Sequence, residues 1–218
     1  MAVSGSKNFN IDVSDAIEEA YERCGVEVRT GYSLRTARRS LNLMLAEWAN
    51  RGVNLFSLEQ VTTTLTQGTS NYTLGIETVD ILEMVLRRNN TDVTMTRMSR
   101  ADYLHLPNKT TQGRPSQFFV DRQVNPVLYL WATPENSTDQ IIYYRLVRID
   151  DADDYNNDFD VPFRFYPCLV SGLAYYLSMK VSPDRVNLLK GVYDEEFARA
   201  ATEDRDRTNL RLVPRIIA

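Results

Sequence analysis

Acidic side chains form the densest group in this sequence that could do chemistry. The spacing that starts at Asp154 begins like a calcium-binding loop, in which carboxylates alternate with other residues. The glycine required at the sixth position is missing, and Phe165 stands where a bidentate glutamate is needed. We therefore expect an acidic loop that is solvated or faces a partner. An ion site is the alternative, and no metal ligand is assigned. The loop residues are Asp150, Asp151, Asp153, Asp154 and Asp158.

Glu47, beside Trp48, is the carboxyl group whose setting best suits a general acid. Glycoside hydrolysis requires two carboxyl groups at a defined separation, one of them with a pKa raised by apolar surroundings. The sequence identifies no partner for Glu47. His105 is the only histidine, and its neighbours offer no nucleophile. We expect no catalytic residue and no cofactor, and keep a cell-wall hydrolase acting through Glu47 as an alternative.

The basic residues near the start of the second predicted helix could bind phosphates or face another protein. The 218-residue chain has a net charge of −4, which argues against a general nucleic-acid binder. Arginine pairs well with carboxylates on neighbouring protein surfaces. We therefore expect subunit contacts here, with a nucleic-acid-binding module as a further alternative. The candidate contact residues are Arg35, Arg38, Arg39 and Trp48.

Two helices are predicted at the N-terminal side of the chain. Asp12 or Ser14 can cap the first helix, and Gly25 can end it. The second has Ser33 as its expected N-cap, an apolar stripe that runs to residue 48, and Gly52 at its expected end. The short connection predicts an antiparallel hairpin.

The middle of the chain changes to the alternating pattern of strands. Residues 61–66 and 141–149 are rich in β-branched side chains, and residues 89–92 are typical of a hairpin turn. Residues 99–104 could form one helical turn. We expect an antiparallel β-domain, either a small sandwich or a barrel.

Helical periodicity returns after the acidic loop. Pro162 is expected in the first turn of one helix, and Ser182 with Pro183 predicts the start of another. The predicted fold class is α+β: a four-helix bundle made by the N- and C-terminal hairpins, with an inserted antiparallel β-domain and an extended C-terminal tail. The predicted parts are residues 1–56, 57–150, 151–207 and 208–218.

The last predicted part is apolar, is punctuated by arginine and has no helical period. Apolar side chains in such a segment normally dock, either on the same chain or on a partner. We keep both possibilities. The residues concerned are Leu210, Arg211, Leu212, Val213, Pro214, Arg215, Ile216 and Ile217.

No apolar stretch reaches the roughly 18 to 20 residues that a membrane span requires. Residues 1–10 lack the apolar centre of a secretory signal. We therefore expect no membrane association.

The segment of residues 41–55, with Met-Leu-Ala-Glu-Trp at residues 44–48, resembles a helix of the head-to-tail adaptor proteins of short-tailed bacteriophages. This group is also called tail tubular protein A-like or head completion proteins. The resemblance extends in pattern to the helix that ends at Cys24-Gly25, to the β-region, and to the helix that contains residues 172–176.

The resemblance implies a structural virion protein at the head–tail junction, made in the host bacterial cytoplasm. Such adaptors assemble as a ring, commonly of twelve subunits, beneath the portal protein. The tail nozzle or tail tube protein binds the opposite side, and double-stranded DNA passes through the channel without sequence-specific binding. The docking tail would be residues 209–218, reaching the portal.

Overall fold

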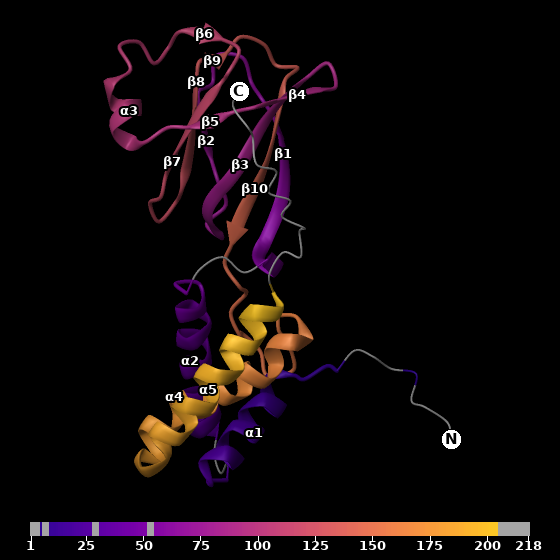
Figure 1. Cartoon of the computed structure of the whole chain (residues 1–218), viewed down its shortest axis with the longest axis vertical. Coiled ribbons are helices and arrows are strands. Elements are labelled where there is room, and N and C mark those ends of the chain that lie inside the picture. The colour runs from indigo at the N-terminus through magenta and orange to yellow at the C-terminus, as the bar shows by residue number, and fades with distance from the viewer. Residues whose placement is uncertain (1–4, 6–8, 28–30, 52–54, 205–218) are drawn as a thin grey trace, which may run out of the picture. The chain divides into compact units, whose positions relative to one another are not determined.

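A computed structural model describes residue 5 and residues 9–27, 31–51 and 55–204 of the chain (Figure 1). The described residues form two compact units. One comprises the residues up to Phe56 and those from Asp150 onward, and the other comprises Ser57–Ile149. The first unit is helical, and the second contains all ten of the described strands.

The helical unit is organised around one buried helix. Helix α4 (Tyr166–Val181) packs against α1 (Val13–Cys24), α2 (Gly31–Trp48) and α5 (Val186–Glu203). All residues from 168 to 174 in α4 are buried, so the helix is covered over most of its circumference. A helix that is apolar on every side is stable only when other elements surround it. The unit also contains the 3-10 turns η2 (Phe163–Phe165) and η3 (Pro183–Arg185).

The ends of α1 confirm the predicted caps. The Asp12 carboxylate accepts a hydrogen bond from the backbone nitrogen of Asp15 at 2.8 Å. Gly25 has φ of 73°, a left-handed conformation that costs glycine little, and its nitrogen donates to the carbonyl of Glu22.

Two predicted helix starts are wrong, and a third is correct in position but lacks the predicted side-chain cap. Helix α2 begins at Gly31, two residues before Ser33. The residues after Pro162 form η2, and α4 begins only at Tyr166. Ser182 and Pro183 do begin a helical turn, η3, and α5 follows from Val186, but Ser182 forms no side-chain cap because its hydroxyl donates to the carbonyl of Cys24 at 2.8 Å. The predicted end at Gly52 lies outside the described residues.

The strand-rich unit contains two four-stranded sheets and one two-stranded sheet. The first sheet is antiparallel, in the order β1 (Leu58–Thr64), β10 (Gln140–Val147), β3 (Thr78–Arg88), β4 (Thr91–Thr94). The second has the order β2 (Asn71–Thr73), β8 (Val127–Trp131), β7 (Gln117–Asp121), β5 (Thr96–Arg97), and β5 runs parallel to β7. The third pairs β6 (Gln112–Gly113) with β9 (Thr133–Pro134) in parallel.

The two larger sheets share one hydrophobic core. Ile81 and Ile141 come from the first sheet, whereas Phe118 and Leu128 come from the second, and all four are at most 1% exposed. Along β7 and β8 every second residue is buried, as expected where a sheet has one buried face.

The predicted turn at residues 89–92 and the predicted helical turn are both confirmed. Asn89 and Asn90 have φ of 51° and 58° and connect β3 to β4, the conformation that asparagine tolerates in tight hairpins. The short helix α3 (Arg100–His105) has a capping box in which Ser99 and Asp102 satisfy each other's backbone nitrogens.

The expected four-helix bundle with an inserted antiparallel β-domain is wrong. The described residues form an α+β structure of five α-helices and ten strands, in which sheets make up much of the core. In the helical unit α1, α2 and α5 pack around α4, which is apolar on nearly all sides. The strand-rich unit contains α3 and two parallel strand pairs. The expected extended tail lies outside the described residues.

Candidate functional site

The acidic loop, residues 150–160, holds the first two helices in place. The backbone nitrogens of Val13 and Ser14 donate to the carbonyls of Asn157 and Tyr155 at 3.2 and 3.0 Å. The Asn42 side chain accepts from the nitrogen of Ala152 at 2.9 Å and donates to its carbonyl at 3.4 Å. The loop therefore ties the start of α1 to the middle of α2.

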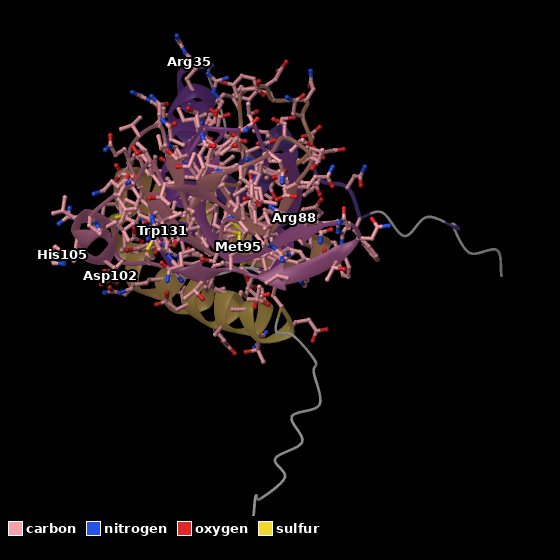
Figure 2. All side chains as sticks on the ribbon, turned by 90° about the horizontal axis from the view of Figure 1, so that it is seen from above. Arg35, Arg88, Met95, Asp102, His105 and Trp131 are labelled. Carbon is pink, nitrogen blue, oxygen red and sulfur yellow. The ribbon has the colours of Figure 1, made fainter. Side chains whose placement is uncertain are left out.

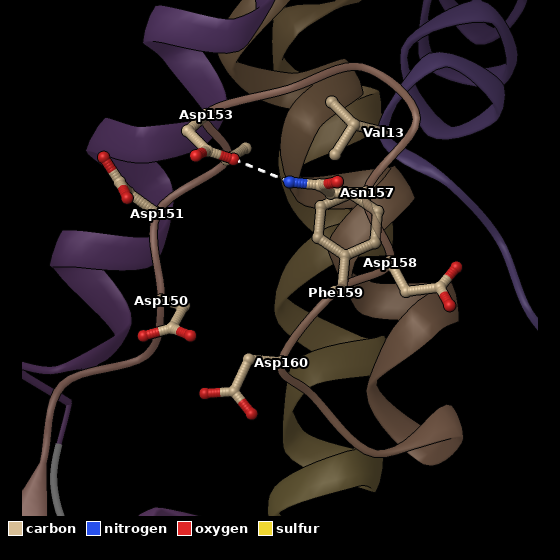
Figure 3. Close-up of a pocket in the computed structure, with 9 residues that line it drawn as sticks. Val13, Asp150, Asp151, Asp153, Asn157, Asp158, Phe159 and Asp160 are labelled. Carbon is tan, nitrogen blue, oxygen red and sulfur yellow. Dashed lines mark hydrogen bonds between the residues drawn. The ribbon is translucent and has the colours of Figure 1, made fainter.

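The same loop encloses a pocket of about 390 Å³ (Figure 3). Asn157 donates to the Asp153 carboxylate at 2.8 Å, and the side chains of Asp150 and Asp160 face each other across the opening. Burial raises the pKa of Asp160, and the neighbouring charge of Asp150 adds to this effect, while a backbone hydrogen bond from Asp150 lowers it. Among the described residues, no group of three or more histidine, cysteine or carboxylate side chains is arranged to hold a metal ion. The lining residues are Val13, Asp150, Asp151, Ala152, Asp153, Asn157, Asp158, Phe159 and Asp160.

Glu47, the candidate general acid, belongs to a network that joins α2 to α5. Its carboxylate accepts from Arg51 Nε at 2.7 Å and from the Tyr193 hydroxyl at 3.4 Å. The Arg51 guanidinium also lies over the rings of Tyr193 and Phe197, at 4.8 and 4.3 Å from their centroids. These contacts give Glu47 a role in holding the two helices together.

The four candidate contact residues of α2 have different surroundings. Trp48 is fully buried and packs on Phe165, with ring centroids 5.7 Å apart. Arg38 donates to the carbonyl of Asp153 and lies over the ring of Tyr155. Arg35 and Arg39 are exposed, and Figure 2 shows Arg35 projecting outward from α2. Arg35 and Arg39 form no ion pair among the described residues. The candidate tail, Leu210–Ile217, lies outside that part of the chain.

The structure also contains an apolar groove that the sequence analysis missed. Phe9 and Phe163 stack on each other with ring centroids 6.0 Å apart, although they are 71% and 60% exposed. The groove beside them has a volume of about 820 Å³. Neither phenylalanine belongs to an apolar stripe of a helix. In the sequence, the groove was therefore indicated only by two large apolar residues that stand next to helix ends.

The remaining residues that could do chemistry, His105 and Cys168, lie in surroundings that do not favour a reaction. His105 ends the exposed helix α3 in the strand-rich unit, where Figure 2 shows it near Asp102. Burial raises the pKa of the Cys168 thiol to about 12, which leaves it protonated and unreactive. Within the described ranges, no helix is both long and apolar enough to cross a membrane.

A model of the family described as "SU10 adaptor protein" matches residues 12–215, which is most of the chain. The chain therefore belongs to the SU10 adaptor protein family of phage head–tail adaptors. It is a structural virion component that interacts with other phage head or tail proteins. The prediction of a head–tail adaptor is thus confirmed, whereas the short-tailed subtype stays a prediction. A search of curated proteins finds no matching sequence.

Proposed function

We propose that this adaptor forms a ring of twelve subunits between the portal and the tail nozzle of a short-tailed phage. The observation that supports this function best is that the side chains suited to chemistry serve the fold. Glu47 joins α2 to α5, and the acidic loop ties α1 to α2. What remains for function are the outer surfaces. In this proposal residues 57–150 face neighbouring subunits or the nozzle.

The ring encloses the channel through which double-stranded DNA passes during ejection. Each phosphate contact made by lysine or arginine strengthens DNA binding, so a strongly positive lumen would retard passage. The net charge of −4 is compatible with a channel that DNA traverses without sequence-specific binding. The adaptor is made in the host bacterial cytoplasm and resides at the head–tail junction.

Residues 209–218 dock on the portal in this proposal. The segment combines Leu210, Leu212, Ile216 and Ile217 with two arginines, a composition suited to an apolar cleft with an acidic rim. Deletion of residues 209–218 is expected to leave the fold intact and to abolish stable attachment to the portal. Attachment of the truncated protein would refute tail docking.

Light scattering tests the adaptor role directly. The mass of the full chain is measured alone and after mixing with the portal protein of the same genome. We expect a discrete, ring-sized increment on the portal. An absence of association at both low and high salt would refute the proposed function.

A further inference from the structure

The apolar groove of the helical unit has no covering among the described residues. It lies between the segment before α1 and the start of α4, and its lining includes Ile11 and Val170. Phe9 and Phe163, both largely exposed, stand beside it. Exposed apolar surface of this kind marks an interaction site in a soluble protein.

One rim of this groove is acidic. Asp15, Glu19 and Arg23 line it from α1 at intervals of four residues, so two of the three charges are negative. Glu18 and Glu22 are exposed on the same helix, so its outward face carries four carboxylates. Glu19 pairs with Arg23 at 2.9 Å, whereas no ion pair is formed by the other three among the described residues. A partner for this groove should therefore combine an apolar side chain with positive charge.

The outward face of α2 has this combination. Arg35, Arg39 and Leu43 follow one another at intervals of four residues, and Leu43 is 64% exposed. Four residues correspond to about 6 Å of rise along a helix. The two arginines are therefore spaced along α2 as Asp15 and Glu19 are along α1.

We propose that the groove of one copy receives the outward face of α2 from a second copy. Leu43 enters the apolar groove beside Phe163, while Arg35 and Arg39 pair with Asp15 and Glu19. This inference rests on the proposed ring and deepens it by naming the contact between subunits.

The proposed contact joins two different surfaces of the same unit. After two copies pair, the copy that supplied its groove keeps a free α2 face and the other keeps a free groove, which is the head-to-tail arrangement that closes into rings. Desolvation of Leu43 and the two phenylalanines would favour the contact, and the charges would set its register.

Charge reversal tests the contact. The full chain carrying Arg35→Glu and Arg39→Glu should need a roughly tenfold or greater increase in concentration for half-maximal assembly, because two attractive pairs become repulsive. The matched control carries Lys190→Glu and Arg199→Glu, which are exposed on α5, lie outside the proposed contact and change the net charge equally. Adding Asp15→Arg and Glu19→Arg to the α2 variant should restore assembly.

Cysteine cross-linking tests the head-to-tail direction. Glu19→Cys and Arg39→Cys variants are oxidised separately and as a mixture, alone and with the portal protein; the native cysteines are buried. We expect cross-linked dimers only in the mixture.

The outcomes separate this contact from the proposed function. Rings that assemble normally after reversal of Arg35 and Arg39 would overturn the contact and leave the adaptor ring standing. Cross-linking of Glu19→Cys with itself would overturn the head-to-tail contact. A wild-type chain that associates neither with itself nor with the portal would overturn both.

Discussion

The indole nitrogen of Trp48 donates a hydrogen bond to the hydroxyl oxygen of Tyr193 at 2.7 Å, which joins α2 to α5 inside the helical unit. Both side chains are at most 1% exposed, so water does not replace this bond. Burial raises the pKa of Tyr193, which keeps the phenol protonated and able to donate in turn to Glu47. The pair therefore links the aromatic core to the charged network beside it.

Replacing Tyr193 with phenylalanine should destabilise the helical unit. The substitution leaves the Trp48 N–H buried without an acceptor, which costs about 1–3 kcal/mol. Urea unfolding monitored by tryptophan fluorescence measures the loss. Tyr144→Phe is the control, because Tyr144 is 43% exposed. Equal midpoints for the two variants would contradict the importance of the bond.

Gly172 and Gly191 should respond in opposite directions to alanine. A Cβ at Gly172 would lie 2.5 Å from Met44 Sδ and 2.7 Å from Tyr193 Cε2, so α2 and α5 leave it no room. Overpacking of this kind costs about 1–3 kcal/mol. A Cβ at Gly191 meets nothing within 4 Å, and alanine should stabilise α5 there by up to about 1 kcal/mol. Thermal unfolding of the two variants compares them, and a stabilised Gly172→Ala would refute the close packing.

The cap at Asp12 should make stability depend on acid pH. Hydrogen bonds from the Asp15 backbone and the Ser14 side chain lower the pKa of Asp12 below its ordinary value of 3.8. A lowered pKa in the folded state contributes stability that is present above 3.8 and is lost as the pH falls through the folded-state pKa. Asp12→Asn keeps the cap but removes the charge. Its unfolding free energy should fall less than that of the wild type between neutral pH and acid. Identical pH profiles would exclude a contribution from Asp12.

The neighbouring arginines Arg87 and Arg88 should differ in their effect on the strand-rich unit. Arg88 binds the Asp139 carboxylate through Nε and Nη2, at 2.9 and 2.6 Å, and the Asp139 side chain is only 3% exposed. Arg88→Met leaves this buried carboxylate without its charged partner, which costs about 3–5 kcal/mol. Arg87→Met breaks a pair with Asp92 that is about 40% exposed on both sides, and should cost less than about 1 kcal/mol. Chemical unfolding of both variants measures the difference, and similar losses would contradict it.

Local signals in the sequence predicted local structure well. The Asp12 and Gly25 caps, the Asn89-Asn90 turn and the capped helix α3 are all confirmed, because each depends on a few adjacent residues. The arrangement of the helices could not be predicted in the same way. Which sides of α4 are covered depends on residues of α1, α2 and α5 far away in the chain. The parallel pairing of β5 with β7 leaves no turn signal, since the two strands are not joined by a hairpin.

Of the candidate site, the sequence predicted only the acidic loop. The acidic loop was recognised from its composition, but its hydrogen bonds to Val13 and Asn42 depend on tertiary structure. The groove beside Phe9 and Phe163 is formed by the segment before α1 and the residues that precede α4. These residues are more than 150 positions apart in the chain, so no pattern in the sequence could bring them together.

Strand β10 lies between β1 and β3 in the first sheet, so β1 has no neighbour other than β10 among the described strands. The last β10 residue paired with β1, Leu146 opposite Leu58, follows the end of β1 by more than 80 residues. During translation the β3–β4 hairpin can form at once, but β1 must wait until β10 has left the ribosome exit tunnel. Unpaired strand edges favour aggregation. Nascent chains of this adaptor therefore pass through a period in which a host chaperone that shields β1 would raise the yield of folded subunits.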